Sequence, residues 1–145
     1  MDMQKIVIAC DHAGFQMKEF IKKQLAEKGF EIVDFGTNSD QSVDYPDYAH
    51  KVGAAISGGE VALGLVLCGT GNGVNMTVNK HKGVRSALCW NEEIARLART
   101  HNNANVCALP ARFVSAQEAW RIVQTFLSAE FEGGRHETRI NKIDL

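Results

Sequence analysis

The sequence predicts an α/β fold, a three-layer doubly wound (Rossmann-like) sandwich around a five-stranded parallel sheet. Short apolar, β-branched runs alternate along the whole chain with segments of helical apolar spacing, which is the pattern of βαβ units. Most of these runs are apolar throughout, as expected of parallel strands that are buried on both faces. The chain has 145 residues, 45% of them hydrophobic, and no linker divides it, so residues 1–145 should form a single domain.

Five runs are expected to form the strands, at residues 5–10, 30–35, 62–68, 85–89 and 105–108. The first connecting helix should end at Gly29, and it carries apolar residues at helical spacing: Met17, Phe20, Ile21 and Leu25. The second should begin near Pro46, which suits a first helical turn, and end at Gly58.

Two further helices are expected in the second half of the chain. Residues 91–100 should place Ile94, Leu97 and Ala98 against the sheet. Residues 115–128 begin with a capping box formed by Ser115 and Glu118. The C-terminal tail, residues 133–145, is too polar to belong to the core.

Charge and composition exclude several classes of partner. The net charge is -1 and both signs are spread along the chain, so no basic block offers a site for nucleic acid or for a membrane surface. No apolar run approaches the ~20 residues that span a bilayer, and the first residues do not resemble a signal peptide. The four cysteines form no CxxC pair, which argues against a zinc knuckle or redox dithiol and favours a reduced, cytoplasmic setting. The expected partners are small molecules or a second copy of the chain.

The most informative segment is the glycine-rich loop Cys68-Gly69-Thr70-Gly71-Asn72-Gly73, which follows a buried strand and leads into a helical segment. Glycines at alternate positions let consecutive backbone N–H groups converge on an anion. A mononucleotide P-loop would require Lys-Ser/Thr after the last glycine, and a dinucleotide fingerprint would require GxGxxG; the loop has neither. Two interpretations are left: a nest for an oxyanion or enediolate beside a reactive thiol, or a tight turn that glycine merely permits.

Cys68 ends a central strand beside these amides, where a thiolate that acts as base or nucleophile would be stabilised. A cysteine in an apolar strand is more often an inert small hydrophobe, and this is the interpretation for Cys10, Cys89 and Cys107. Ligands of doubly wound sheets bind beyond the carboxyl ends of the strands. Asp11-His12 is expected at the same edge as Cys68, where Asp11 could also be only a helix cap.

Two polar clusters lie near helix ends. The segment His101-Asn102-Asn103-Ala104-Asn105 carries more hydrogen-bonding groups than a short connection needs, although histidine caps and asparagine turns are common. Arg135 and Arg139, at i and i+4 with His136 beside them, form either a solvated charged face or a phosphate clamp.

These segments, in this order and over nearly the whole chain, resemble the ribose-5-phosphate isomerase B family, which is related to the galactose-6-phosphate isomerase subunits. The matching segments are Ala9–Gly14, Gly36-Thr37, Asp44-Tyr45-Pro46, Cys68–Gly73, Asn79-Lys80, His101-Asn102 with Asn105-Val106, and Glu132–His136 with Arg139. The resemblance implies a Rossmann-like isomerase of the pentose phosphate pathway that interconverts ribose 5-phosphate and ribulose 5-phosphate without a metal or an organic cofactor. It also implies a homodimer or a dimer of dimers with shared active sites, in which the tail, residues 133–145, reaches a neighbouring subunit.

The resemblance further implies a role for each site residue. Cys68 corresponds to the base that moves a proton between C1 and C2 through a cis-enediolate, and Thr70 to the group that helps the transfer between O1 and O2. His101 would open the furanose ring, with Asp11 and Asn102 near the ring oxygens. The other substrate-binding residues are Gly69, Gly71, Asn72 and Gly73 for the enediolate charge, Tyr45 for the sugar, and His12, Arg112, Arg135, His136 and Arg139 for the phosphate.

Three alternatives stay open. Pro110 stands where the family is expected to have glycine, so the loop that carries Arg112 could differ. A hexose 6-phosphate, of allose or galactose, is an alternative substrate, because one more carbon changes only the distance from Cys68 to the phosphate ligands. A phosphate- or nucleotide-binding module without chemistry is less favoured, since it would need the glycine loop and the arginines but not Cys68 or His101.

Overall fold

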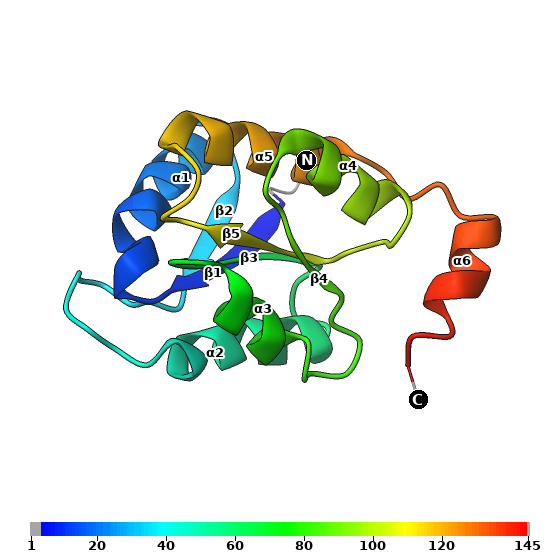
Figure 1. The fold of residues 1–145 in the computed structure, drawn as a ribbon, viewed down its shortest axis with the longest axis horizontal. Coiled ribbons are helices and arrows are strands. Elements are labelled where there is room, and N and C mark those ends of the chain that lie inside the picture. The colour runs from blue at the N-terminus through cyan, green and yellow to red at the C-terminus, as the bar shows by residue number, and fades with distance from the viewer. Residues whose placement is uncertain (1–3, 145) are drawn as a thin grey trace.

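The computed structural model describes residues 4–144 and shows a parallel sheet between two layers of helices (Figure 1). The strands are β1 (Lys5–Cys10), β2 (Glu31–Asp34), β3 (Leu63–Cys68), β4 (Ser86–Leu88) and β5 (Val106–Pro110). Their order is β2-β1-β3-β5-β4, and every neighbouring pair is parallel. The predicted fold class and sheet are therefore confirmed. The strand order reverses between β1 and β3, which is where open α/β sheets bind their ligands.

The helices cover both faces of the sheet. α1 (Phe15–Glu27), α4 (Glu92–Thr100) and α5 (Ala116–Ser128) pack on one face, and α2 (Tyr45–Ser57) and α3 (Asn72–Val78) on the other (Figure 1). A short 3-10 turn, η1 (His12–Gly14), precedes α1. α6 (Arg135–Ile140) stands at one end of the sandwich, apart from both layers (Figure 1). Among the helices of residues 4–144, none has the length and apolar character needed to cross a membrane.

Alternate residues of each strand enter two separate cores, because successive side chains of a strand point to opposite faces. Ile6 and Ile8 of β1 pack beneath the layer of α1, α4 and α5, whereas Val7 and Ala9 face α2 and α3. All four are buried. Burial on both faces explains why the strands could be recognised as unbroken apolar runs.

The helix ends follow the predicted capping residues. Gly29 lies just beyond α1 with a φ of 90°. Ser115 Oγ accepts a hydrogen bond from the backbone N–H of Glu118 at 3.1 Å, as expected for the capping box. These local signals fixed the boundaries of α1 and α5 to within a few residues.

The predicted orientation of Ile94 is wrong. Its side chain is 42% exposed, whereas Ala98 faces the core as predicted and Ala95 is buried in place of Ile94. α4 packs against α5 with these two alanines in the same core cluster as the apolar face of α5. Because small side chains allow the helices to approach closely, the buried stripe is set by packing and not by the largest apolar residue.

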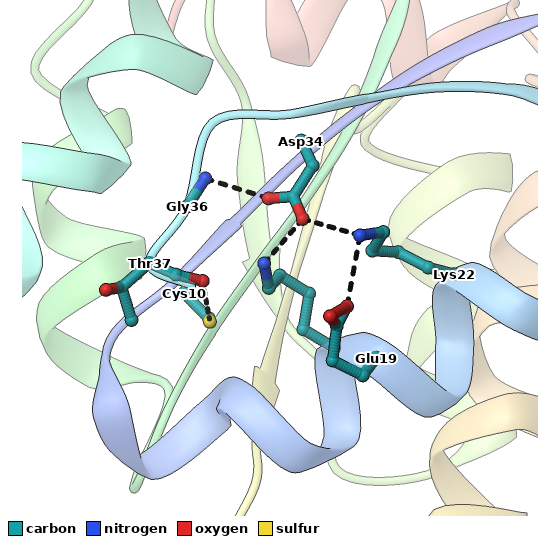
Figure 2. Close-up of polar contacts among 7 residues, drawn as sticks. Cys10, Glu19, Lys22, Asp34, Gly36 and Thr37 are labelled. Atoms are coloured by element: carbon teal, nitrogen blue, oxygen red, sulfur yellow. Dashed lines mark hydrogen bonds and ion pairs between the residues drawn. The ribbon is translucent and has the colours of Figure 1, made fainter. Parts of the chain in front are cut away.

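A buried ion-pair network ties α1 to the end of β2 (Figure 2). The fully buried Lys18 places Nζ 2.6 Å from Asp34 Oδ2, and Lys22 Nζ lies 2.7 Å from the same oxygen. Asp34 Oδ1 accepts a hydrogen bond from Gly36 N at 2.8 Å, and Gly36 O accepts one from Cys10 N at 2.7 Å. Although burial alone would raise it, the hydrogen bonds from both lysines hold the pKa of Asp34 below its ordinary value. The network therefore fixes the chain after β2 beside the end of β1.

We expect Asp34→Asn to lower the free energy of unfolding by about 3–5 kcal/mol, because Lys18 would keep a buried charge without its partner. Adding Lys18→Met should recover part of the loss, since that charge is then absent. Because the pKa of Asp34 is depressed in the folded state, its stabilisation is present above the ordinary carboxyl pKa and is lost as the pH falls through the folded value. Urea unfolding gives the free energy of unfolding of the wild type, of Asp34→Asn and of the double variant with Lys18→Met. A loss below about 1 kcal/mol in Asp34→Asn would contradict the stabilising role of the ion pair.

Candidate active site

The glycine-rich loop turns sharply from β3 into α3 at the point where the strand order reverses. Gly71 has a φ of 77°, and a Cβ there would lie 2.5 Å from the Leu88 side chain, so the turn requires glycine. Thr70 Oγ1 accepts a hydrogen bond from Asn72 N at 3.2 Å, which uses a lone pair and keeps the hydroxyl hydrogen for another acceptor. Thr70 and Asn72 are exposed. The loop therefore presents a hydroxyl donor at the carboxyl edge of the sheet.

Cys68 is the last residue of β3 and is 5% exposed. Its carbonyl oxygen accepts a hydrogen bond from Ala111 N at 2.9 Å, which ties the end of β3 to the turn after β5. The surroundings of two other cysteines favour the protonated thiol. Burial raises the pKa of Cys10 to about 12, and a hydrogen bond with Cys89, together with burial, raises the pKa of Cys107 well above its ordinary value. Both fit the inert interpretation.

Asp11 and His12 follow β1, on the other side of the switch point. The Asp11 carboxylate accepts hydrogen bonds from the N–H groups of Ala13 and Gly14 at 3.0 and 3.2 Å, so it does cap the following turn. His12 Nδ1 accepts a hydrogen bond from Val43 N at 3.2 Å. A neutral His12 therefore carries its proton on Nε2, and this N–H can donate to an anionic ligand.

Tyr45 forms one wall beside the loop. It begins α2 and is 39% exposed. A Cβ on Gly73 would lie only 2.5 Å from Tyr45 Cζ, so the missing side chain lets the aromatic ring rest on the loop backbone. An exposed aromatic ring in this position offers an apolar surface for a sugar to pack against.

Arg112, two residues after Pro110, lies close to the glycine loop. Pro110 is the last residue of β5 and pairs in register with Cys68. Arg112 N donates to Gly69 O at 3.0 Å, and a Cβ on Gly69 would lie 3.2 Å from Arg112 Nη1. The guanidinium thus lies over the loop and adds positive charge beside Cys68. The loop half-site, as we name this group, consists of Asp11, His12, Tyr45, residues 68–73 and Arg112.

A second group lies at the end of α4 and on the C-terminal tail. The ring of His101 stacks on that of His136, with centroids 4.1 Å apart and an angle of 13° between planes. Glu132 Oε1 lies 3.9 Å from His101 Nε2 and 3.6 Å from His136 Nε2. Burial lowers the pKa of His136, and the charges of His101 and Arg135 lower it further. The tail half-site, as we name this group, consists of His101, Asn102, Glu132, Arg135, His136 and Arg139.

The members of the tail half-site differ in how far their positions followed from the sequence. Arg135 and Arg139 are exposed on α6 one turn apart, as predicted. Glu132 belongs to a matching segment but carries no local signal of a role. Its approach to His101 depends on a contact between α4 and the tail, which local sequence patterns do not encode.

His101, Glu132 and His136 could also hold a metal ion, because their ligand atoms lie within 4.8 Å of one another. A tetrahedral zinc site requires nitrogen atoms ~2.0–2.1 Å from the metal with lone pairs that converge on it. Two stacked imidazole rings direct their lone pairs side by side. One ring would have to turn out of the stack before both could coordinate the same ion.

The two half-sites lie at opposite edges of the sheet within one chain. Cys68 pairs with Pro110 at the carboxyl ends of β3 and β5, whereas Gly64 pairs with Val106 where these strands begin. The strand from Gly64 to Cys68 spans about 13 Å. His101 directly follows α4 and comes before Val106, so it lies beyond the edge where β5 starts. Its stacking on His136 of α6 places the C-terminal tail on the same side. The candidate residues are brought together in two groups and not in one.

Comparison with known proteins shows which family the chain resembles. The model of the family described as Ribose/Galactose Isomerase matches residues 6–143. Ribose-5-phosphate isomerase B of Escherichia coli (strain K12) is 44% identical over 141 residues, which cover 97% of this chain and 95% of that protein.

Solved structures agree with the sequence comparison. A ribose 5-phosphate isomerase from Thermotoga maritima superposes with a TM-score of 0.96 at 53% identity and covers 99% of both chains. Ribose-5-phosphate isomerase B from Mycoplasma genitalium with bound ribulose-5-phosphate has a TM-score of 0.94 at 48% identity, covering 98% of this chain and 95% of that one. Because the family model matches nearly the whole chain and the relatives are 44–53% identical over most of their length, the chain belongs to the ribose/galactose isomerase family.

Proposed function

We propose that this protein is an aldose–ketose isomerase that interconverts ribose 5-phosphate and ribulose 5-phosphate. The observation that carries the proposal is the position of Cys68, a thiol at the end of β3 where the strand order reverses, next to a glycine loop that carries the Thr70 hydroxyl and that the Arg112 side chain approaches at Gly69. Relatives named ribose-5-phosphate isomerase B match nearly the whole chain, and one of their structures holds ribulose-5-phosphate.

The chemistry requires one base that carries a proton between two neighbouring carbons. Cys68 as thiolate would take the proton from C2 of the open-chain aldose, form a cis-enediolate and return the proton to C1. Thr70 keeps its hydroxyl hydrogen to donate and would help the proton pass between O1 and O2. Backbone N–H groups of Gly69–Gly73 would stabilise the negative oxygen, a contribution of about 3–4 kcal/mol per donor in other enzymes.

Phosphate recognition would draw on both half-sites. His12 can donate from Nε2, because its Nδ1 is occupied by Val43 N. Arg112 lies over the glycine loop, and Arg135 and Arg139 lie exposed on α6. Guanidinium groups match phosphate oxygens in a bidentate fashion, which makes these arginines suitable ligands.

We infer that the working unit is a homodimer, alone or as half of a dimer of dimers. Ring opening by His101 breaks the bond between C1 and the ring oxygen, and enolisation by Cys68 moves a proton between C1 and C2 of the same sugar. Both side chains must therefore reach one substrate molecule. The distance across the sheet keeps them apart within one chain. A two-fold axis that places each tail half-site against the partner's loop half-site would complete two equal sites, and it would give α6 a surface to pack against.

The substrate assignment can be tested directly. Purified protein is mixed with ribose 5-phosphate in buffer that contains a chelator, and ketopentose formation is followed, with allose 6-phosphate and galactose 6-phosphate run alongside. Turnover of the pentose supports the proposal. Turnover of a hexose phosphate alone would keep the mechanism and change the substrate. If none of the three sugar phosphates is converted and nucleotides raise the melting temperature of the protein, a binding module without chemistry would be favoured.

Cys68→Ala should fold normally and lose isomerase activity, with kcat/KM falling by roughly 10²–10⁴, the usual contribution of a general base. Exchange of the C2 hydrogen of the substrate with deuterium oxide should be lost as well. Cys107→Ala removes another buried thiol outside both half-sites and should keep the activity. If exchange persists in Cys68→Ala, another residue is the base.

His101→Ala should impair ring opening more than enolisation. Erythrose 4-phosphate cannot close a furanose ring because its O4 carries the phosphate, so its conversion should fall less than that of ribose 5-phosphate. For each substrate, kcat/KM of the variant is divided by that of the wild type, and the ratio for erythrose 4-phosphate is compared with the ratio for ribose 5-phosphate. Equal losses on both substrates would remove the ring-opening role from His101.

A further inference from the structure

Glu132 is held next to His101 by the backbone. Its N–H donates to the carbonyl oxygen of Thr100 at 3.0 Å, and Thr100 is the last residue of α4. Arg99 Nε donates to Ala129 O at 3.3 Å, which ties the start of the same segment to α4. The segment 129–132 therefore runs along the last turn of α4, and the Glu132 side chain starts beside His101.

The Glu132 carboxylate faces one nitrogen of each stacked ring. Oε1 lies 3.9 Å from His101 Nε2 and 3.6 Å from His136 Nε2. A carboxylate has no proton to donate at neutral pH, so it favours a proton on the Nε2 atoms that face it. For a neutral His101 this leaves the lone pair on Nδ1, the nitrogen that does not face Glu132.

His136 supports the same arrangement. Its side chain is almost fully buried, and burial lowers its pKa, with further lowering by His101 and Arg135. A neutral ring can stack on His101 while His101 carries a positive charge, whereas two charged rings 4.1 Å apart would repel each other. His101 therefore has His136 stacked on one face and the Glu132 carboxylate facing its Nε2 at 3.9 Å, an ion-pair distance.

We propose that Glu132 is a positioning residue for furanose ring opening: it orients His101 through Nε2, so that Nδ1 exchanges protons with the sugar. The inference rests on the proposed isomerase function. In the reaction the bond from C1 to the ring oxygen breaks, its electron pair stays on the ring oxygen, and that oxygen gains a proton. The hydroxyl on C1 loses a proton and becomes the aldehyde oxygen. One proton is removed and one is delivered, so a neutral imidazole whose Nδ1 first takes the proton of the C1 hydroxyl and then gives a proton to the ring oxygen ends in its starting state.

The test separates ring opening from enolisation. Ribulose 5-phosphate is acyclic, because its carbonyl is at C2 and its O5 carries the phosphate. Exchange of its C1 hydrogen in deuterium oxide therefore reports enolisation alone, whereas conversion of ribose 5-phosphate requires both steps. The variants are Glu132→Gln, which keeps the shape and removes the charge, and Glu132→Asp. Glu130→Gln is the matched control, an exposed acid two residues away that is in neither half-site.

Glu132→Gln should lower kcat/KM for ribose 5-phosphate by roughly tenfold or more, as expected when an acid–base catalyst loses its orientation, and should leave C1 exchange near the wild-type rate. Glu132→Asp should recover part of the loss, and Glu130→Gln should match the wild type. Equal losses in both assays, or no loss in either, would overturn the role of Glu132. If the wild-type protein converts no ribose 5-phosphate at all, the proposed function fails first and the role of Glu132 falls with it.

The tautomer of His101 gives a second measurement that does not depend on activity. In ¹⁵N NMR spectra of the imidazole groups, with the His101 signals assigned from the His101→Ala variant, the neutral ring should carry its proton on Nε2. In Glu132→Gln the two tautomers should mix. A proton on Nδ1 in the wild-type protein would contradict the proposal, even if Glu132→Gln lowers turnover.

Discussion

All five strands run in the same direction, and this constraint decides where each functional group can lie. In a parallel sheet every strand ends at one edge, and every connecting helix returns the chain to the other. Asp11, Cys68 and Arg112 meet because each follows the end of a strand. His101 lies at the opposite edge because it ends a helix. One chain therefore carries two separate groups of candidate residues, and the proposed function requires a second copy to bring them together.

Each half-site is fixed mainly by hydrogen bonds to the backbone. Residues 111 and 112 donate to the carbonyl oxygens of Cys68 and Gly69, and Val43 N occupies His12 Nδ1. The Lys18–Asp34 network lies behind this assembly and fixes the chain after β2 against the end of β1. Because the backbone carries the positioning, the outward side-chain atoms, such as the Thr70 hydroxyl hydrogen and His12 Nε2, stay available for a ligand.

Local patterns were sufficient for much of the fold and for the glycine loop with Cys68, whereas Tyr45 and Arg112 of the loop half-site were assigned through the family resemblance. Apolar runs marked the strands because both faces of the sheet are buried, and Ser115 and Gly29 marked helix ends through their own hydrogen bonds and dihedral angles. The glycine loop could be recognised because Gly71 needs a positive φ at a close approach to Leu88. Features confined to a few consecutive residues can be predicted from those residues.

The remaining features depend on contacts between distant segments. Lys18 would be expected on the surface, yet it is fully buried because Asp34, on another element, supplies its partner. Ile94 is exposed because the packing of α4 on α5 selects Ala95 and Ala98. The pairing of Glu132 with His101, and the distance of His101 from Cys68, follow from the path of the chain through the sheet. No local pattern contains that information.

The central claim is that each active site takes Cys68 from one chain and His101 from another. The direct measurement mixes the variants Cys68→Ala and His101→Ala, dissociates them, lets them reassociate and follows conversion of ribose 5-phosphate. A mixed dimer with shared sites contains one site with both residues intact, so random mixing should restore about one quarter of the wild-type activity. If each site is built within a single chain, no chain in the mixture has both residues and the activity will stay at the level of the separate variants.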